Sequence, residues 1–265
     1  MLMRILRLIK RILKKFCLHL SQIYYYIVGN EVECNICHYK VNKLRSDFWH
    51  LYCHCPKCGS GVRQRLLMAA FTIINNFSIQ RIIKDKKVLH FAPEKSLGKF
   101  IKEHASIYKT ADFLAPEYSY GKIDYNVDIS DMKEISNEAF DCVIACDVLE
   151  HVRNHISGIK EVYRILNFGG YCIFTVPQKD NLEKTFEDLS VIDPNEREKI
   201  FGQSDHLRIY GNDFRDMLEN AGFAVTVVDE KFFNEKIVKK HVLFPPILSK
   251  HPLATNYRKV FFGKK

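Results

Sequence analysis

The chain has 265 residues, enough for one catalytic domain and a small additional module. Hydrophobic residues make up 47% of it and charged residues 27%, a balance that excludes a wholly disordered or a membrane-embedded chain. Six of the nine net positive charges lie in the first fifteen residues, so the remainder is only mildly basic, which counts against a surface that follows a nucleic-acid backbone.

Residues 1–28 have the periodicity of an amphipathic helix. Apolar side chains such as Leu2, Ile9 and Phe16 fall on one face, and the basic residues fall on the opposite face. Such a helix fits a membrane interface, with its cations toward anionic headgroups, or a protein surface, and both interpretations stay open. The uncharged stretch at 16–30 is shorter than the roughly 20 apolar residues that span a bilayer.

Residues 31–62 have the spacing of a metal site, with two C-x2-C pairs separated by seventeen residues. The four cysteines are Cys34, Cys37, Cys55 and Cys58. This spacing predicts a structural, zinc-ribbon-like Zn²⁺ site of four thiolates, with a single iron as the alternative. Three further residues lie close enough to be rival ligands, namely His38, Cys53 and His54. The odd total of nine cysteines favours a reducing, cytoplasmic location over a disulfide framework.

From residue 63 onward, helical and strand patterns alternate. Helices are predicted at 63–77, 96–104, 156–166 and 212–220. Strands are predicted at 87–92, 106–113, 140–146, 171–176, 224–229 and 258–263. This alternation implies a doubly wound α/β domain over residues 63–265, with a mostly parallel sheet and helices on both faces. A ligand is then expected at the carboxyl ends of the strands.

The turn after the first of these strands, His90-Phe91-Ala92-Pro93-Glu94, is the expected cofactor position. It lacks the glycines that let a pyrophosphate approach the backbone, which counts against a dinucleotide. S-adenosylmethionine has no phosphate and offers a methionyl carboxylate instead. Asp112 follows Ala92 by twenty residues, the distance at which an acid typically binds ribose hydroxyls. The acids Asp128 and Asp147 stand near the ends of later strands.

The stretch 140–152, with Asp147-Val148-Leu149-Glu150-His151, resembles class I S-adenosylmethionine-dependent methyltransferases of the broad Methyltransf_11 type, as do the segments 161–166 and 169–170. The turn at 90–94, the four cysteines upstream and the block 201–211 are similar to a bacterial subset of these enzymes. The resemblance runs from about residue 34 to the C-terminus and leaves out the basic first helix. It implies a Rossmann-like sheet of seven strands and methyl transfer from S-adenosylmethionine.

The resemblance also implies roles for individual residues. It places Asp112 at the ribose, and Asp128 with Ile129 beside the adenine. Around the methionyl end of the cofactor it places His90, Phe91, Ala92, Pro93, Glu94 and Asp147. Other interpretations stay open, because Asp147 and Glu150 also match a D-x-x-E capping box, and a strand histidine such as His90 is more often part of the core.

A general base is needed only if the methyl acceptor starts protonated, because the sulfonium already activates the methyl group. His206 and His151 are the candidates for this base. Arg208 and Tyr210 are the candidates for positioning the substrate. The sequence leaves open that His206 only holds its loop and that Arg208 only pairs with a neighbouring carboxylate.

The sequence thus predicts three segments: a basic helix at 1–30, a zinc module at 31–62 and a methyltransferase domain at 63–265. The predicted function is methylation of a small molecule or a glycan, near the inner face of a membrane if residues 1–28 lie on one. One alternative is an RNA methyltransferase that grips rRNA or tRNA through its zinc module. Another is a non-catalytic protein that binds the cofactor. The oligomeric state is left undetermined.

Overall fold

The computed structural model describes residues 29–47, 50–113 and 123–265. At its centre is a seven-stranded sheet with the order β10-β11-β7-β6-β3-β4-β5. The strands are β3 (Lys87–Phe91), β4 (Ile107–Asp112), β5 (Tyr125–Asn126), β6 (Phe140–Cys146), β7 (Leu166–Thr175), β10 (Ala224–Val228) and β11 (Val260–Lys264).

The sheet is mostly parallel, as the sequence predicts. Strands β3 to β7 pair in parallel, and β11 runs antiparallel to both of its neighbours, β7 and β10. The chain starts in the middle at β3, runs outward through β4 to β5, and returns to the other side of β3 at β6. This reversal creates a switch point between β3 and β6, where doubly wound sheets bind their ligands.

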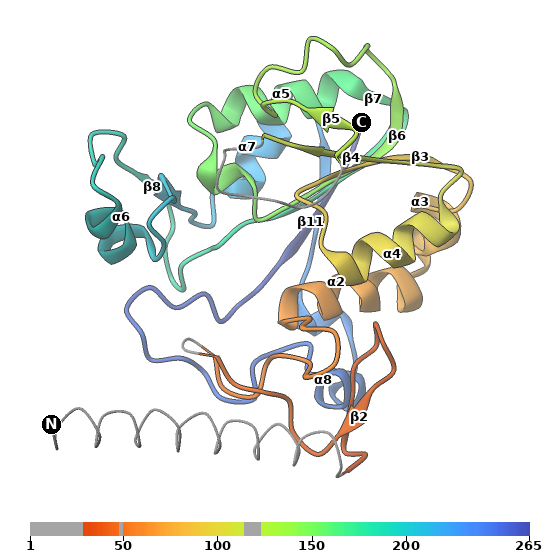
Figure 1. Cartoon of the computed structure of the whole chain (residues 1–265), viewed down its shortest axis with the longest axis vertical. Coiled ribbons are helices and arrows are strands. Elements are labelled where there is room, and N and C mark those ends of the chain that lie inside the picture. Colours follow the sequence, from red (N-terminus) through yellow and green to blue (C-terminus); the bar gives the residue numbers. More distant parts are fainter. Residues whose placement is uncertain (1–28, 48–49, 114–122) are drawn as a thin grey trace, which may run out of the picture.

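Helices cover both faces of the sheet (Figure 1). Helices α2 (Val62–Ile73), α3 (Ile79–Ile82) and α4 (Lys95–His104) lie on one face, and α5 (His155–Ile165) and α7 (Phe214–Asn220) lie on the other. The central strands are apolar at consecutive positions because successive side chains enter opposite cores. In β3, Val88 packs in the core of α2 to α4, and Leu89 packs in the core of α5 and α7.

Most predicted elements are confirmed, and the differences have local causes. β6 has the predicted bounds, whereas β7 begins at Leu166 instead of Tyr171. The extra residues pass through a bulge opposite β6 and through Gly169, whose φ of 77° ends the alternation that marks a strand in sequence. The helix predicted at 63–77 ends at Ile73, where extended Ile74 leads into the 3-10 turn Asn75–Phe77.

An excursion after β7 went unpredicted. It contains β8 (Phe186–Glu187), α6 (Pro194–Phe201) and β9 (Arg208–Ile209), and β8 pairs antiparallel with β9. Asp193 caps α6 by accepting hydrogen bonds from two backbone amides, and Gly202 ends the helix with a φ of 95°. The excursion brings the segment at 201–209 over the carboxyl edge of the sheet.

The four-cysteine module packs against the catalytic domain. It holds the hairpin of β1 (Val32–Glu33) and β2 (Lys40–Val41), followed by a second knuckle that runs directly into α2. A bridge joins Leu51 to Ile247, and the Glu33 carbonyl lies 2.7 Å from Nδ1 of His241 at the end of α8 (Glu235–His241). The module is therefore attached both to α2 and to the segment around α8.

Arg65 of α2 joins the four-cysteine module to the end of α8 through hydrogen bonds. It is fully buried, and its guanidinium donates to the carbonyls of Ser60 and Cys53 in the module. It also donates to the carbonyls of His241 and Val242 at the end of α8. Because buried carbonyl groups need hydrogen-bond donors, one side chain satisfies four backbone groups from two distant segments.

The predicted helix at residues 1–28 lies outside the described residues. Among the helices that the structure does describe, none is both long and apolar enough to cross a bilayer. The division of the chain at residues 30 and 62 stays a prediction.

Replacing Arg65 by methionine should lower the free energy of unfolding by about 3 kcal/mol or more, because four buried carbonyl groups lose their donor. Chemical denaturation of the full chain measures this change. The exposed Arg45 of the same module is the matched control, and Arg45→Met should stay within about 0.5 kcal/mol of wild type. Equal stabilities of the two variants would contradict the role assigned to Arg65.

Candidate active site

The turn after β3 makes the left-handed bend that glycine usually provides. Ala92 has a φ of 43°, and its amide donates to the Ala111 carbonyl on β4 at 3.0 Å. Glu94 follows as the residue before α4. A left-handed conformation is strained for a residue with a Cβ, so the pairing with β4 has to hold it in place. The turn thus keeps its shape without the glycine pattern.

His90 belongs to the core and holds Glu94. The ring is fully buried, with Nδ1 3.0 Å from the Tyr108 hydroxyl and Nε2 3.1 Å from Oε2 of Glu94. Both ring nitrogens are thus used within the protein, as the alternative interpretation of His90 expects. The His90 ring can therefore influence a cofactor through Glu94, which it contacts. The direct contact between His90 and the cofactor stays a prediction.

Four charged side chains form a network at the carboxyl edge of β3 and β6. Arg63 of α2 places Nη1 2.7 Å from Oε1 of Glu94 and Nε 3.1 Å from Oδ2 of Asp147. Arg258 approaches the same Oδ2 at 3.6 Å, and the Thr175 hydroxyl donates to Oδ1 of Asp147 at 2.9 Å. Two cations balance two carboxylates, so a zwitterionic ligand could exchange partners here without leaving a charge unpaired.

Both carboxylates of this network are ionised at neutral pH. Burial alone would raise the pKa of Glu94, but the charge of Arg63 and the hydrogen bond with His90 lower it to about 2. Burial likewise opposes ionisation of Asp147, whose pKa is nevertheless lowered by Arg63, Arg258 and the Thr175 hydroxyl.

The capping-box interpretation of Asp147 and Glu150 is wrong. Helix α5 begins later, and its N-cap is Asn154, whose side chain accepts a hydrogen bond from the Ser157 amide at 3.2 Å. Asp147 instead has a left-handed φ of 52°, and its amide donates to the Thr175 carbonyl. This backbone turns its carboxylate toward the arginines.

Asp112 ends β4, and its two carboxylate oxygens have different surroundings. Its Oδ1 accepts the Phe113 amide at 2.8 Å, whereas Oδ2 is buried and has no hydrogen-bond partner in the described part of the chain. Burial raises the pKa of this side chain. A buried acceptor without a donor fits the hydroxyl groups of a ribose, so the side chain predicted for that role has an oxygen available for it.

The two residues predicted to flank the adenine, Asp128 and Ile129, lie in different environments. Oδ1 of Asp128 accepts both the amide and the hydroxyl of Ser130 at 2.7 Å, which closes a turn after β5. Ile129 is 2% exposed and packs in the core beneath α5. Contact of Ile129 with an adenine would therefore involve its backbone, and the role stays a prediction.

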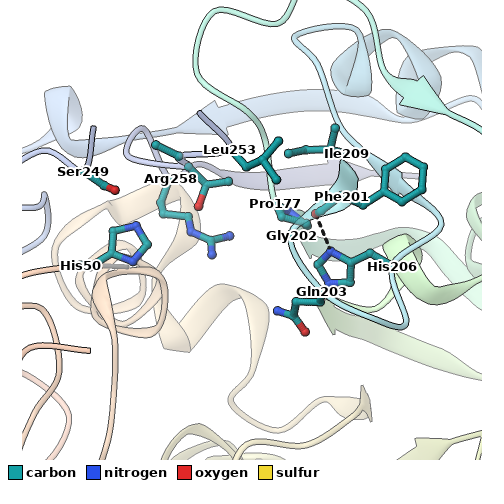
Figure 2. Close-up of a pocket in the computed structure, with 12 residues that line it drawn as sticks. His50, Pro177, Phe201, Gly202, Gln203, His206, Ile209, Ser249, Leu253 and Arg258 are labelled. Carbon is teal, nitrogen blue, oxygen red and sulfur yellow. Dashed lines mark hydrogen bonds between the residues drawn. The ribbon is translucent and has the colours of Figure 1, made fainter. Parts of the chain in front are cut away.

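A cavity of about 100 Å³ opens beside the charge network. Its polar lining includes His50 from the four-cysteine module, Gln203 and His206 from the segment after α6, and Arg258 before β11. In Figure 2 the Arg258 guanidinium lies between His50 and the His206 ring. Because Arg258 also approaches Asp147, the cavity borders the network at which the cofactor is expected.

The structure brings His206 and His151 together, and His206 lines this cavity. Their rings meet edge to face, with centroids 4.8 Å apart, and His206 is 4% exposed. Burial, and then the charge of His151, lower the pKa of His206 to about 4, so the ring is neutral at neutral pH. Its second nitrogen thus has a lone pair to offer.

The predicted substrate contacts of Arg208 and Tyr210 are corrected. Arg208 is fully buried, pairs with Glu187 and donates to the carbonyls of Leu149 and Val152. Tyr210 is also fully buried, with its hydroxyl 3.1 Å from Nδ1 of His155. Since their polar groups are engaged within the protein, these side chains support the loop after β6 and do not face a ligand.

The four predicted cysteines converge. Their sulfur atoms all lie within 4.8 Å of one another, with Cys34 and Cys58 3.7 Å apart and Cys37 and Cys55 3.6 Å apart. The three residues considered as alternative metal ligands contact other groups. His38 faces Glu33, His54 faces Asp47, and the Cys53 thiol donates to the Leu51 carbonyl. No disulfide joins the cysteines of the described residues.

Three basic residues of the site went unpredicted, namely His50, Arg63 and Arg258. None of them belongs to a recurrent motif. Arg63 stands five residues after Cys58, and Arg258 lies in an irregular segment before the last strand. Only the folding of α2 and β11 onto the same edge of the sheet brings them to Asp147.

A doubly wound sheet with acids at its carboxyl edge is the architecture of a Rossmann-like fold, whose ligands bind at that edge. A family model described as a methyltransferase domain matches residues 58–228. The chain belongs to this family and is an S-adenosylmethionine-dependent methyltransferase. None of the curated proteins compared with the chain matches it.

Solved structures similar to the chain include an S-adenosylmethionine-dependent methyltransferase from Mesorhizobium loti, with 14% identity, 69% of this chain and 92% of that chain covered, and a TM-score of 0.46. A second methyltransferase, from Archaeoglobus fulgidus, has 13% identity, coverage of 77% and 95%, and a TM-score of 0.48. A third, the 1,6-didemethyltoxoflavin-N1-methyltransferase of Burkholderia thailandensis, has 13% identity, coverage of 76% and 78%, and a TM-score of 0.47.

Protonation of Glu94 at acidic pH should lower the free energy of unfolding. Its pKa is lower in the folded chain than the ordinary 4.5, so its stabilising effect is complete above pH 4.5 and is lost as the pH falls toward 2. Glu94→Gln should make the free energy of unfolding depend less on pH in this window, as measured by denaturation at several pH values. Glu103→Gln, on the exposed side of α4, should leave the wild-type slope unchanged. An unchanged slope in Glu94→Gln would refute the assignment.

Proposed function

We propose that this methyltransferase transfers the methyl group of S-adenosylmethionine to a small-molecule or glycan acceptor bound in the cavity beside Asp147. The observation that carries the proposal is the cavity of about 100 Å³, which borders the charge network and has a mixed polar and apolar lining. A hollow of this size suits a small group better than the backbone of a nucleic acid.

The residues at the sheet edge fit the cofactor. Asp112 would hold the ribose through Oδ2, the oxygen that has no partner among the described residues. Glu94 would hold the methionyl amine, and Arg63 would hold the methionyl carboxylate. In this exchange the zwitterion replaces an existing ion pair, so each charge keeps a partner. When bound, S-adenosylmethionine supplies a methyl group that its positive sulfur already activates.

The chain then has to align the acceptor and exclude water. His50 of the four-cysteine module lines the cavity, and Arg258 links the cavity wall to Asp147. Gln203 adds an amide that can bind an acceptor hydroxyl. The proposed acceptor is therefore polar on one side and is held partly by the four-cysteine module.

Asp112→Asn should weaken binding of the product S-adenosylhomocysteine by about ten- to a hundredfold, because the ribose hydroxyls lose a charged acceptor. Isothermal calorimetry on the full chain measures this loss. Asp131→Asn changes an exposed carboxylate and should bind the product as wild type does. Absence of binding to folded wild type would end the proposal.

A labelled-methyl transfer assay on fractionated cell extract tests the acceptor. Label should enter a small-molecule or glycan fraction. Label confined to RNA would overturn the proposed acceptor class, and folded protein that binds the cofactor but labels no fraction would favour the non-catalytic alternative. The membrane contact predicted for residues 1–28 stays a prediction.

We also propose that the four cysteines bind one structural zinc ion. Zn–S bonds of about 2.3 Å place the sulfurs of a tetrahedral site about 3.8 Å apart, close to the separations in the two cysteine pairs. The two knuckles are alike, since the His38 amide donates to the Cys34 carbonyl as the Gly59 amide donates to the Cys55 carbonyl. Four protein ligands leave no open position, so the role of the ion is structural.

Cys34→Ser should lose zinc and lower the melting temperature, because the module is too small to fold around its own core. Zinc is counted by mass spectrometry of the purified chain, with about one ion per wild-type molecule expected. Cys53→Ser is the matched control, since that buried thiol lies in the same module but outside the cluster. Equal zinc loss in both variants, or iron in place of zinc, would disprove the assignment.

A further inference from the structure

A second group of potential metal ligands lies outside the four-cysteine module. Glu150 and His151 belong to the 3-10 turn Leu149–His151 after β6, and His206 precedes β9. One ligand atom from each residue lies within 4.8 Å of the other two. Since first-row divalent cations bind nitrogen and carboxylate oxygen at about 2.1 Å, a small inward shift would bring all three atoms onto one cation.

The Glu150 side chain provides independent evidence for a ligand. It is 1% exposed, and its Oε2 has no hydrogen-bond partner within the described ranges of the chain. A buried carboxylate oxygen without a partner is costly. The buried Arg208 guanidinium is engaged elsewhere, with Glu187 and the Leu149 carbonyl among its partners. A cation beside Oε2 would supply the missing partner.

Each imidazole has its Nδ1 engaged within the protein. Nδ1 of His151 lies 3.3 Å from a carboxylate oxygen of Asp205, and Nδ1 of His206 lies 3.3 Å from the Phe201 carbonyl. These contacts favour protonation at Nδ1, which leaves the lone pair of each ring on Nε2. Histidine ligands commonly donate their other ring nitrogen to a carboxylate or carbonyl in this way.

One member of the cluster, His206, lines the acceptor cavity. His206 lines that cavity together with Gln203 and Arg258, and Figure 2 shows the His206 ring beside Gln203. Two histidines and one carboxylate occupy only three positions of a first-row cation. The remaining positions would face the space in which an acceptor binds, unlike the closed shell of the four cysteines.

We propose that Glu150, His151 and His206 bind one divalent first-row cation at the edge of the cavity, and that the acceptor binds this cation through a hydroxyl oxygen. The two histidines predicted as general bases are then metal ligands. The part of the proposal that concerns the acceptor rests on the proposed function, whereas the cation site does not.

The cation removes the need for a protein base. A hydroxyl group bound to it loses its proton to water more readily, because the positive charge stabilises the alkoxide. The oxygen lone pair then forms a bond to the methyl carbon as the bond from that carbon to sulfur breaks. The sulfur keeps the electron pair and becomes the thioether of S-adenosylhomocysteine. The products are a methyl ether, the thioether and one proton in solvent.

Manganese titration of the zinc-loaded full chain tests the site, because Mn²⁺ prefers oxygen and nitrogen ligands to a thiolate cage. Electron paramagnetic resonance should show uptake of about one Mn²⁺ per chain, with nitrogen couplings from histidine. Glu150→Gln and His206→Gln should each weaken this uptake at least tenfold. Glu134→Gln, at an exposed position, should bind Mn²⁺ as wild type does.

Failure of wild type to take up Mn²⁺, uptake without nitrogen couplings, or equal uptake by Glu150→Gln would overturn the proposal. The wild-type spectrum decides even if a variant fails to fold. Calorimetry with S-adenosylhomocysteine on the same samples separates the two proposals. Normal binding of this product without Mn²⁺ uptake would contradict only the proposed cation site. Mn²⁺ uptake without binding of the product would contradict only the proposed function.

Discussion

Arg63 and Arg65 stand two positions apart in the first turns of α2, so their side chains leave the helix in directions about 200° apart. Arg65 reaches the carbonyls of the module and of the end of α8, and Arg63 reaches Glu94 and Asp147 at the sheet edge. Both need buried partners, because a guanidinium removed from water is stable only when its donors are satisfied. The start of α2 therefore fixes the module and the cofactor edge relative to each other.

This constraint gives the module a part in the active site as well as in stability. Its second knuckle runs directly into α2, and its central loop contributes His50 to the cavity. A metal ion that holds the knuckles would thus also hold one wall of the proposed acceptor site. Loss of that ion should disturb the acceptor side more than the ribose side, because Asp112 lies at the end of β4, on the far side of β3.

Sequence patterns identified the helices and strands that depend on local residue types or on hydrophobic periodicity. The strand at 140–146 was predicted with its final bounds because its apolar run is flanked by clear breaks. β5 was missed because two residues cannot show an alternating pattern. The first five residues of β7 were missed because the bulge there interrupts the alternation. In the site, the acids at strand ends were predictable, since Asp112 and Asp147 follow strands. Arg208 and Tyr210 were misassigned because nothing in a sequence tells a buried partner from a ligand.

The sequence by itself determined the main strands of the sheet, the cysteine cluster and the acids at the carboxyl edge, because each depends on spacing along the chain. Tertiary structure alone decided which charges neutralise those acids and that His50 reaches the cavity. It also brought Glu150 beside two histidines, with one of its oxygens lacking a partner among the described residues. The physical reason is distance along the chain. Arg63 and Arg258 meet at one carboxylate although 195 positions separate them, and only the packing of α2 and β11 on the same sheet brings them together.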